Sequence, residues 1–243
     1  MIINMRREII HAAGEIHSVF ITHQLFVKCP VKLKFLEPLI HFIVSYFINK
    51  YDECYIPDLS GKINFSGTLS HQKKIPSNAR FIGILSRFSE NKSELISKNY
   101  DVSILISGPE PQRTIFENKC LNLLQGQMKK CCIIRGLPGS KEKKNDSENI
   151  TWYNHLSDNE LKAVLRYSKK VVCRPGYSTI MDLVELNVKA MLVPTPGQTE
   201  QEYLALHNKE NELFEIIEQD KMTLKDLIME VNQPLIQQIE KIY

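Results

Sequence analysis

Short apolar runs recur along most of the chain, and stretches of helical length separate them. The runs that are typical of buried strands are 80–85, 100–107, 130–135, 150–153, 170–173 and 190–193. The helices predicted after them are 112–125, 157–166, 177–187, 199–219, 223–231 and the tail 234–243. Because strands alternate with helices, the pattern predicts an α/β fold with a doubly wound parallel sheet, Rossmann-like in its architecture.

The start of the chain follows a shorter version of the same pattern. The elements predicted there are a strand at 17–22, a helix at 31–50 and a strand at 52–57. Leu59 to Ser77 is rich in Ser, Gly, Lys and Pro without a clear period, and we interpret it as a linker. We therefore expect residues 1–77 to be the remnant of a second α/β domain whose beginning is absent, and residues 78–243 to be a Rossmann-like α/β domain.

The composition is that of an ordinary soluble protein. Hydrophobic residues make up 43% and charged residues 24%, and the net charge of +3 is too small to indicate a nucleic-acid partner. The six cysteines contain no CxxC pair, so we expect buried, reduced thiols and neither a disulfide framework nor a zinc site. No apolar signal-peptide segment follows Arg6, Arg7 and Glu8, and the expected location is the cytoplasm.

One apolar segment, 33–48, raises the question of a membrane. It is interrupted by Lys34, Glu37, Pro38 and His41. Its uninterrupted part is shorter than the roughly 20 residues that a membrane-spanning helix needs. A buried or amphipathic helix is the favoured interpretation. The alternative is a patch that lies on a membrane surface, helped by Lys28, Lys32 and Lys34.

The stretch from Val171 to Pro196 combines a strand, a glycine turn, a helix and a second strand. A strand that turns through Gly176 into a helix forms an anion site, because the first N–H groups of a helix lack intrahelical acceptors and the macrodipole is positive there. Asp182, one turn into the helix, can accept a hydrogen bond from a sugar hydroxyl. The residues that open this helix are Tyr177, Ser178 and Thr179. The alternative is that Ser178 or Thr179 is only a helix cap.

Three further loops follow predicted strands, and in a doubly wound sheet such loops face one crevice. Their candidate binding residues are Ser107, Gly108, Gln112 and Arg113 in the first, Leu156 in the second, and Gln198, Glu200 and Gln201 in the third. Ser157 with Glu160 forms a capping box for the helix after the second loop. The charged segment 141–148 is predicted to be a surface loop. Each loop alone is also compatible with an ordinary strand–helix turn.

Several known catalytic motifs are missing from the sequence. It contains no GxGxxG, no Walker lysine loop, no HExxH and no GxSxG. The stretch RPGYSTIMDLVELNVKAMLVPTPGQTEQEYLA is instead similar to the donor-binding half of GT-B glycosyltransferases of family 28, the MurG type. The matching positions are Arg174, Gly176, Ser178, Thr179, Asp182 and Gln201. The resemblance extends from Ala79 to the C-terminus and is specific over 173–205.

This resemblance implies a UDP-sugar donor site. The diphosphate would lie over the helix opened by Tyr177, Ser178 and Thr179, and Asp182 would hold the ribose hydroxyls. The uracil would meet the backbone near Leu156. The donor sugar would contact Gln198, Glu200 and Gln201, and the loop from Ser107 to Arg113 would face the phosphates. The implied reaction is inverting transfer of a hexosyl or N-acetylhexosaminyl group to an acceptor hydroxyl, with no cofactor and no metal.

The acceptor side is less defined. A general base is expected, and His23 is favoured over His11 and His17 because it follows a predicted strand. The acceptor would be a saccharide or a lipid-linked molecule, and the rest of the N-terminal domain could be a separate subunit. Two alternatives stay open: a nucleotide-sugar-binding subunit that needs a partner, and a UDP-sugar 2-epimerase.

Overall fold

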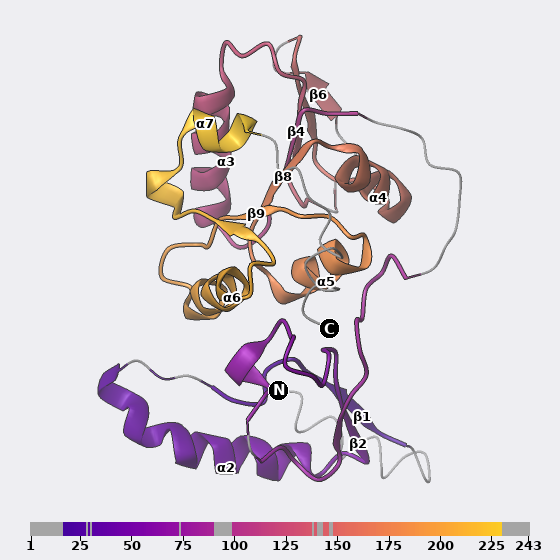
Figure 1. Cartoon of the computed structure of the whole chain (residues 1–243), viewed down its shortest axis with the longest axis vertical. Coiled ribbons are helices and arrows are strands. Elements are labelled where there is room, and N and C mark those ends of the chain that lie inside the picture. Colours follow the sequence, from indigo (N-terminus) through magenta and orange to yellow (C-terminus); the bar gives the residue numbers. More distant parts are fainter. Residues whose placement is uncertain are drawn as a thin grey trace. The chain divides into compact units, whose positions relative to one another are not determined.

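The computed structural model describes residues 17–27, 29, 31–72, 74–89, 99–137, 139, 143–145 and 148–229. The chain forms two compact units, Met1–Ile84 and Leu85–Tyr243. Each unit has its own sheet and its own hydrophobic core (Figure 1).

The first unit is built on a three-stranded parallel sheet in the order β1-β2-β3. Its elements are β1 (Val19–Ile21), the 3-10 helix η1 (Val31–Leu36), α2 (Glu37–Ile48), β2 (Glu53–Ile56), the 3-10 helix η2 (Gly67–Leu69) and β3 (Ala79–Phe81). The two predicted strands and the predicted helix are confirmed, with shorter bounds. Pro38 lies in the first turn of α2, where its missing N–H removes no helical bond.

The predicted linker at 59–77 is wrong, because this segment packs into the first unit. Phe65 and Leu69 are buried, and Asp58 accepts hydrogen bonds from the backbone of residues 65 and 66. The chain then continues into β3, whose Ala79 and Phe81 pair with Cys54 and Ile56 of β2. The run from Arg80 thus belongs to the first sheet, and the units divide after Ile84, whereas the sequence placed the boundary after residue 77.

The second unit contains a seven-stranded sheet in the order β10-β9-β8-β4-β5-β7-β6. Its elements are β4 (Val102–Leu105), α3 (Gln112–Leu124), β5 (Cys131–Ile134), β6 (Lys143–Asn145), β7 (Ile150–Tyr153), α4 (Asp158–Tyr167), β8 (Lys170–Cys173), α5 (Tyr177–Glu185), β9 (Met191–Leu192), α6 (Thr199–Glu210), β10 (Glu215–Ile216), the 3-10 helix η3 (Gln219–Lys221) and α7 (Leu224–Ile228). All neighbours pair in parallel except β6 with β7. The predicted doubly wound parallel sheet is confirmed.

The central strands are buried at every position, as expected for strands covered on both faces. In Figure 1, α3 and α7 lie on one side of this sheet and α4 and α5 on the other. The core includes Ile104, Phe116, Ile133 and Val172. Burying each such side chain contributes about 1.5–3 kcal/mol.

The strand order creates a topological switch point between β4 and β8. The chain proceeds from β4 to β5 and then to β7, and returns to place β8 on the other side of β4. The loops after β4 and after β8 therefore leave the sheet in opposite directions. In open α/β sheets the crevice between two such loops is where ligands bind.

Three parts of the second unit differ from the prediction. Part of the expected loop at 141–148 forms the edge strand β6, antiparallel to β7. The helix expected at 199–219 ends at Glu210, because Glu212 has a positive φ and Leu213 and Phe214 are buried before β10. The helix expected at 223–231 is present as α7 but spans only Leu224–Ile228, and it has a capping box of Thr223 and Asp226. The tail 234–243 lies outside the described residues.

The cysteines follow the expectation of buried thiols. None of the six forms a disulfide, and all except the half-buried Cys29 are buried. Burial raises the pKa of the Cys120 and Cys173 thiols to about 12, so both stay protonated at neutral pH. Across the residues that the structure describes, no helix is long and apolar enough to cross a membrane.

Candidate functional site

The N-terminus of α5 lies on one side of the switch point and carries no cap from a side chain. Gly176 is its N-cap residue, and no acidic residue stands in its first turn. Its first helical hydrogen bond runs from the Ile180 N–H to the Gly176 carbonyl, 3.0 Å apart. Ser178 is exposed and Thr179 is half-buried. This helix end therefore presents the positive end of the macrodipole without a carboxylate of its own first turn.

Arg174, two residues before Gly176, is fully buried. Its guanidinium donates to the carbonyls of Val193 and Pro194 at 2.9 and 3.0 Å. It also donates to the Gln219 side chain at 2.5 Å and lies 4.0 Å from the centre of the Phe116 ring. Burial lowers the pKa of Arg174 to about 10, which leaves it charged at neutral pH. Arg174 thus ties the loop after β9, η3 and α3 to the end of β8, with its side chain in the interior.

Asp182 is buried, and it accepts hydrogen bonds from two residues that were not predicted from the sequence to belong to the site. It accepts from Ser86 Oγ at 2.6 Å and from Arg87 Nε at 2.9 Å. Arg87 Nη1 also lies 3.3 Å from Asp158 of α4. A carboxylate has about four lone-pair sites, so two protein donors leave room for further donors. The partners of Asp182 are 95 and 96 residues away in the chain, and no local motif connects them.

The loop after β4 lies on the other side of the switch point. Gly108 has a φ of 107°, a conformation that favours glycine. The Thr114 N–H at the start of α3 donates to the Glu110 carboxylate at 3.2 Å, and Arg113 Nε donates to the same carboxylate at 3.0 Å. Hydrogen bonds from Arg113 hold the pKa of Glu110 below its usual range. The predicted donor contact Arg113 is thus engaged with its own loop.

Two other predicted residues of this loop have different surroundings. Ser107 is half-buried directly before Gly108. The carbonyl of Gln112 accepts from Arg174 at 3.4 Å, which links the start of α3 to the end of β8. The side-chain oxygen of Gln112 is buried and, among the described residues, has no hydrogen-bond partner.

The predicted uracil loop follows β7. Leu156 is buried, and Ser157 after it forms the predicted capping box with Glu160 at the start of α4. Asn154 accepts from Arg135 Nη1 at 3.2 Å, and its carbonyl accepts from the Leu137 N–H at 2.7 Å. These bonds hold the loop close to the end of β5.

The loop between β9 and α6 was predicted to contact the donor sugar and is called the sugar loop. Side chains from the first turn of α6 hold it in place by hydrogen bonds. Gln198 is the N-cap residue of α6, and Glu200 lies half-buried in its first turn. The Gln201 side chain accepts from the Thr195 N–H at 2.9 Å. Glu202 accepts from the Gly197 N–H at 2.9 Å. Gln201 and Glu202 therefore stabilise the conformation of the loop itself.

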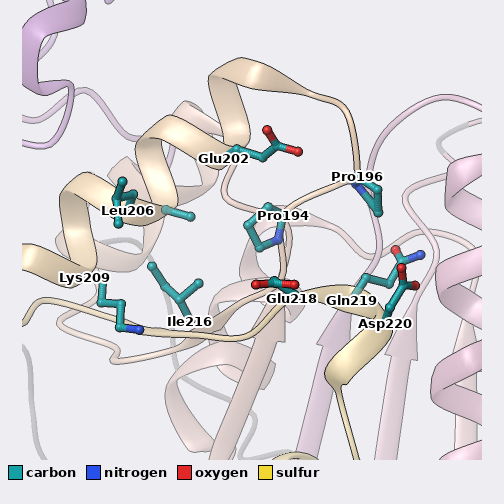
Figure 2. Close-up of a pocket in the computed structure, with 10 residues that line it drawn as sticks. Pro194, Pro196, Glu202, Leu206, Lys209, Ile216, Glu218, Gln219 and Asp220 are labelled. Carbon is teal, nitrogen blue, oxygen red and sulfur yellow. The ribbon is translucent and has the colours of Figure 1, made fainter.

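A pocket of about 410 Å³ adjoins the sugar loop. Its lining consists of Pro194, Pro196, Glu202, Ala205, Leu206, Lys209, Ile216, Glu218, Gln219 and Asp220. Figure 2 shows Glu202 on one side of Pro194, with Glu218 and Asp220 on the other. The side chain of Gln219, one of the lining residues, accepts a hydrogen bond from Arg174 at the end of β8, whereas no lining residue belongs to the loops after β4 and β8.

His23, the predicted base, lies two residues after the end of β1, at the carboxyl end of the first sheet. It is half-buried in a short loop. The N–H groups of Leu25 and Phe26 both donate to the Leu69 carbonyl, at 2.9 and 3.0 Å, and fix this loop. His17 precedes β1 and contacts Glu53 at 3.3 Å, and His11 lies outside the described residues.

Acidic residues, histidines and cysteines do not gather into a metal-binding group in the part of the chain that the structure describes.

The model of the glycosyltransferase family 28 C-terminal domain matches residues 116–242, just over half of the chain. The chain belongs to glycosyltransferase family 28. The matched region includes α5 and the sugar loop, so the family 28 resemblance of this region is confirmed. The loop after β4 and the first unit precede it.

Solved structures show the same GT-B fold. The glycosyltransferase of kitacinnamycin matches with a TM-score of 0.63 at 12% identity, over 99% of this chain and 74% of its own. The calicheamicin glycosyltransferase CalG4 matches with a TM-score of 0.55 at 10% identity, over 92% and 63%. A Listeria monocytogenes protein assigned as a UDP-N-acetylglucosamine 2-epimerase matches with a TM-score of 0.51 at 12% identity, over 93% and 67%. The sequence matches none of the curated proteins.

Proposed function

We propose that this family 28 protein transfers a hexosyl or N-acetylhexosaminyl group from a UDP-sugar to an acceptor hydroxyl, with inversion at the anomeric carbon. The observation that carries the proposal is the N-terminus of α5, which lies at the switch point and has Gly176 as its N-cap in place of a polar side chain. A diphosphate supplies the negative charge that such a helix end favours.

The donor would span three loops of the second unit. Its diphosphate would lie over Gly176, Tyr177, Ser178 and Thr179, with the loop of Ser107 and Gly108 on the other side of the switch point. The uracil would lie at the backbone near Leu156, and the sugar at the loop of Gln198, Glu200 and Gln201. The buried Arg174 would serve this site by holding its loops in place.

Arg87 and Asp182 would form the ribose and phosphate side of the site. Asp182 has lone pairs left for ribose hydroxyls, and its bond to Arg87 holds a guanidinium against α5. The Arg87 side chain is 44% exposed, so a ligand can reach it. We add Arg87 to the donor-binding residues on this ground.

The proposed mechanism needs charge stabilisation on the leaving diphosphate and a base for the acceptor. The α5 N-terminus and Arg87 would stabilise the charge that develops on UDP as the glycosidic bond breaks, with no metal required. His23 would take the proton of the acceptor hydroxyl as its oxygen attacks the anomeric carbon from the opposite face. A single displacement of this kind inverts the configuration.

The test is incubation of the purified chain with UDP-sugars and detection of transfer, hydrolysis or epimerisation. Transfer to a saccharide or lipid-linked acceptor, or hydrolysis, supports the glycosyltransferase. Tight UDP binding without turnover would instead indicate a donor-binding subunit that needs a partner. Conversion of the donor into its 2-epimer would indicate the epimerase.

One substitution tests the donor-site assignment itself. Asp182→Ala is expected to weaken UDP binding about tenfold, the loss of one or two charge-assisted hydrogen bonds. Asp158→Ala is the matched control, because Asp158 is the second carboxylate partner of Arg87. Unchanged UDP affinity in Asp182→Ala would refute the assignment.

We also propose that the protein works at the cytoplasmic face of a membrane and contacts anionic lipid through α2. The residues Leu39, Phe42, Ile43 and Tyr46 recur at helical spacing, and all four are exposed. Phe42 is 70% exposed, and Phe35 just before the helix is 74% exposed. Lys50 stands over the Tyr46 ring at the end of this α2 apolar face, where its ammonium can meet lipid phosphate.

Vesicle sedimentation tests this contact. The chain is expected to bind vesicles of anionic phosphatidylglycerol more than vesicles of zwitterionic phosphatidylcholine, and Phe42→Ser should reduce the bound fraction. Met128→Ser is the control, because Met128 is an apolar residue of the second unit that is 89% exposed. Equal binding of wild-type protein and Phe42→Ser would contradict the contact.

A further inference from the structure

Asp58 of the first unit is a fully buried carboxylate with an unusual number of donors around it. It lies two residues after the end of β2, at the carboxyl end of the first sheet. Burying a charge is unfavourable unless hydrogen bonds replace its hydration. Asp58 receives such bonds from the backbone N–H groups of Leu59, Phe65 and Ser66, at 2.8, 3.0 and 2.8 Å. The Ser66 hydroxyl adds another at 2.5 Å.

A side-chain network extends from Asp58. The hydroxyls of Ser66 and Ser70 contact each other, and both lie within hydrogen-bond distance of His71 Nδ1, at 3.3 and 3.1 Å. His71 Nε2 lies 2.8 Å from the Leu59 carbonyl, and the His71 ring stacks on Phe81 of β3. A carbonyl only accepts, so Nε2 carries the proton in this arrangement.

Ser66, Ser70 and His71 are not suited to direct chemistry in this arrangement. Both ring nitrogens of His71 are engaged with the protein, and its side chain is only 16% exposed. Ser66 and Ser70 are fully buried. The role of the network is therefore to hold the neighbouring segments of the chain in place.

A chain of hydrogen bonds leads from Asp58 to the His23 loop. Asp58 fixes the N–H of Ser66, and the Ser66 carbonyl accepts from the Leu69 N–H at 3.1 Å to form η2. The Leu69 carbonyl then accepts from both Leu25 and Phe26. These residues are buried two and three positions after His23, so the position of η2 determines where the His23 loop lies.

We infer that Asp58 is a positioning residue for catalysis, which sets the place of His23 through Ser66, η2 and Leu69. The inference rests on the proposed function, in which His23 takes the proton of the acceptor hydroxyl. Displacement of a catalytic group by about 1 Å can lower a rate by about 100-fold. A base on a short loop therefore needs a rigid support, and the buried carboxylate at the end of the neighbouring strand supplies it.

The decisive variant is Asp58→Asn. An amide can keep one oxygen toward Leu59 and Phe65, but its NH2 group then faces the N–H and hydroxyl of Ser66 and cannot accept from them. Asp52→Asn is the matched control. Asp52 also accepts from a backbone N–H and a serine hydroxyl, both of Ser18, but it is exposed at the amino end of the same β2 strand.

The kinetic test measures kcat and KM for UDP-sugar turnover at a temperature where all variants are folded. Asp58→Asn is expected to lower kcat by about 10- to 100-fold while the KM for the donor changes by less than about twofold, because the donor loops belong to the second unit. Asp52→Asn should match wild type in both constants. Equal kcat for Asp58→Asn and wild type would overturn the inference.

A double-variant cycle separates positioning from a general structural effect. If Asp58 acts through His23, Asp58→Asn should have almost no further effect on the residual rate of His23→Ala. A fully additive loss in the double variant would show that Asp58 acts on something else. If His23→Ala itself equals wild type, the role of His23 in the proposed function fails, and the positioning role falls with it.

Proton NMR of the histidine rings tests the same link without turnover. The His23 signal, identified by its absence in His23→Ala, is expected to shift or broaden in Asp58→Asn and to stay in place in Asp52→Asn. An unmoved His23 signal in Asp58→Asn would refute the positioning of His23 even if no donor is turned over. A wild-type chain that does not bind UDP would refute the donor site, but the shift of the His23 signal would still test the positioning of His23.

Discussion

The two strand–helix turns at the switch point have the same topology but different helix starts. The turn from β4 into α3 is closed by its own side chains: Glu110 caps the Thr114 N–H, and Arg113 neutralises Glu110. Neither N-cap residue, Pro111 of α3 or Gly176 of α5, supplies a side-chain cap, and neither helix has an acidic residue in its first turn. The helices differ in the Glu110 carboxylate, which stands directly before the N-cap of α3 and has no counterpart at Pro175 before α5. A helix that carries its own carboxylate has little need of an external anion, whereas a helix that lacks one favours a bound anion. On this difference we propose that α5 is the anion-binding member of the pair.

Arg174 connects the two turns, and its replacement is expected to have the largest effect. Arg174→Met would leave the carbonyls of Val193 and Pro194 and the side chain of Gln219 without their donor. Each buried acceptor left unsatisfied costs about 1–3 kcal/mol, so we expect a loss of roughly 3 kcal/mol or more in the free energy of unfolding. Urea denaturation measures it. A loss below about 1 kcal/mol would show that Arg174 does not hold the turns together.

Transfer of a cap to α5 is expected to have the next largest effect. Gly176→Asp would place a carboxylate at the open helix end, which should weaken UDP binding by about 30-fold or more, the equivalent of ~2 kcal/mol. The stability of the fold should stay the same or rise slightly, because aspartate is a good N-cap residue. Isothermal titration calorimetry with UDP measures the affinity.

Gly176→Ala is the control for this experiment. A Cβ at Gly176 would lie 3.7 Å from Thr179 Oγ1, an ordinary contact, and the φ of −69° suits alanine. We expect it to retain most of the UDP affinity. Similar affinity losses in both variants would mean that Gly176 matters for its shape and that the charge argument is wrong.

Removal of the existing cap from α3 is expected to have the smallest effect. Glu110→Gln should lower the melting temperature slightly and leave UDP affinity unchanged, because the open N-terminus of α5, and not the start of α3, would bind the diphosphate. A fall in UDP affinity comparable to that of Gly176→Asp would remove the contrast between the two turns.

The same cap has a predicted dependence on pH. Arg113 lowers the pKa of Glu110 in the folded protein, so the contribution of this carboxylate is present above its unfolded pKa and is lost as the pH falls through the lowered pKa. The melting temperatures of wild type and Glu110→Gln should therefore converge in acid. A difference that stays constant down to low pH would contradict the role of the Glu110 charge.

Much of the second unit could be predicted from the sequence because its signals are local. Buried strands such as Lys170–Cys173 are continuous apolar runs, and the glycine turn and the Ser157 capping box follow from short spacings. Strand β10 was missed because two residues carry no periodicity, and β6 because its residues are charged and polar. The linker at 59–77 was misread because most of the donors around Asp58 are backbone N–H groups, which no side-chain pattern reveals.

The candidate site was predictable as a set of loops but not as a set of contacts. The resemblance identified Arg174, but its direction depends on Gln219, which is 45 residues away in the chain, and on Phe116 of α3. Asp182 was likewise identified without its partner Arg87. Long-range pairs of this kind depend on the tertiary fold, so a sequence pattern indicates which loops meet and leaves open which side chains face the ligand.

Binding of the diphosphate at the start of α5 is tested most directly by the response of backbone amides to UDP in a ¹⁵N-labelled sample. We expect the amide signals of Tyr177, Ser178 and Thr179 at the start of α5 to move most, and the Thr114 amide, already bonded to Glu110 at the start of α3, to move little. Saturating UDP that leaves the α5 amides in place, or that moves the α3 amide more, would contradict the central claim.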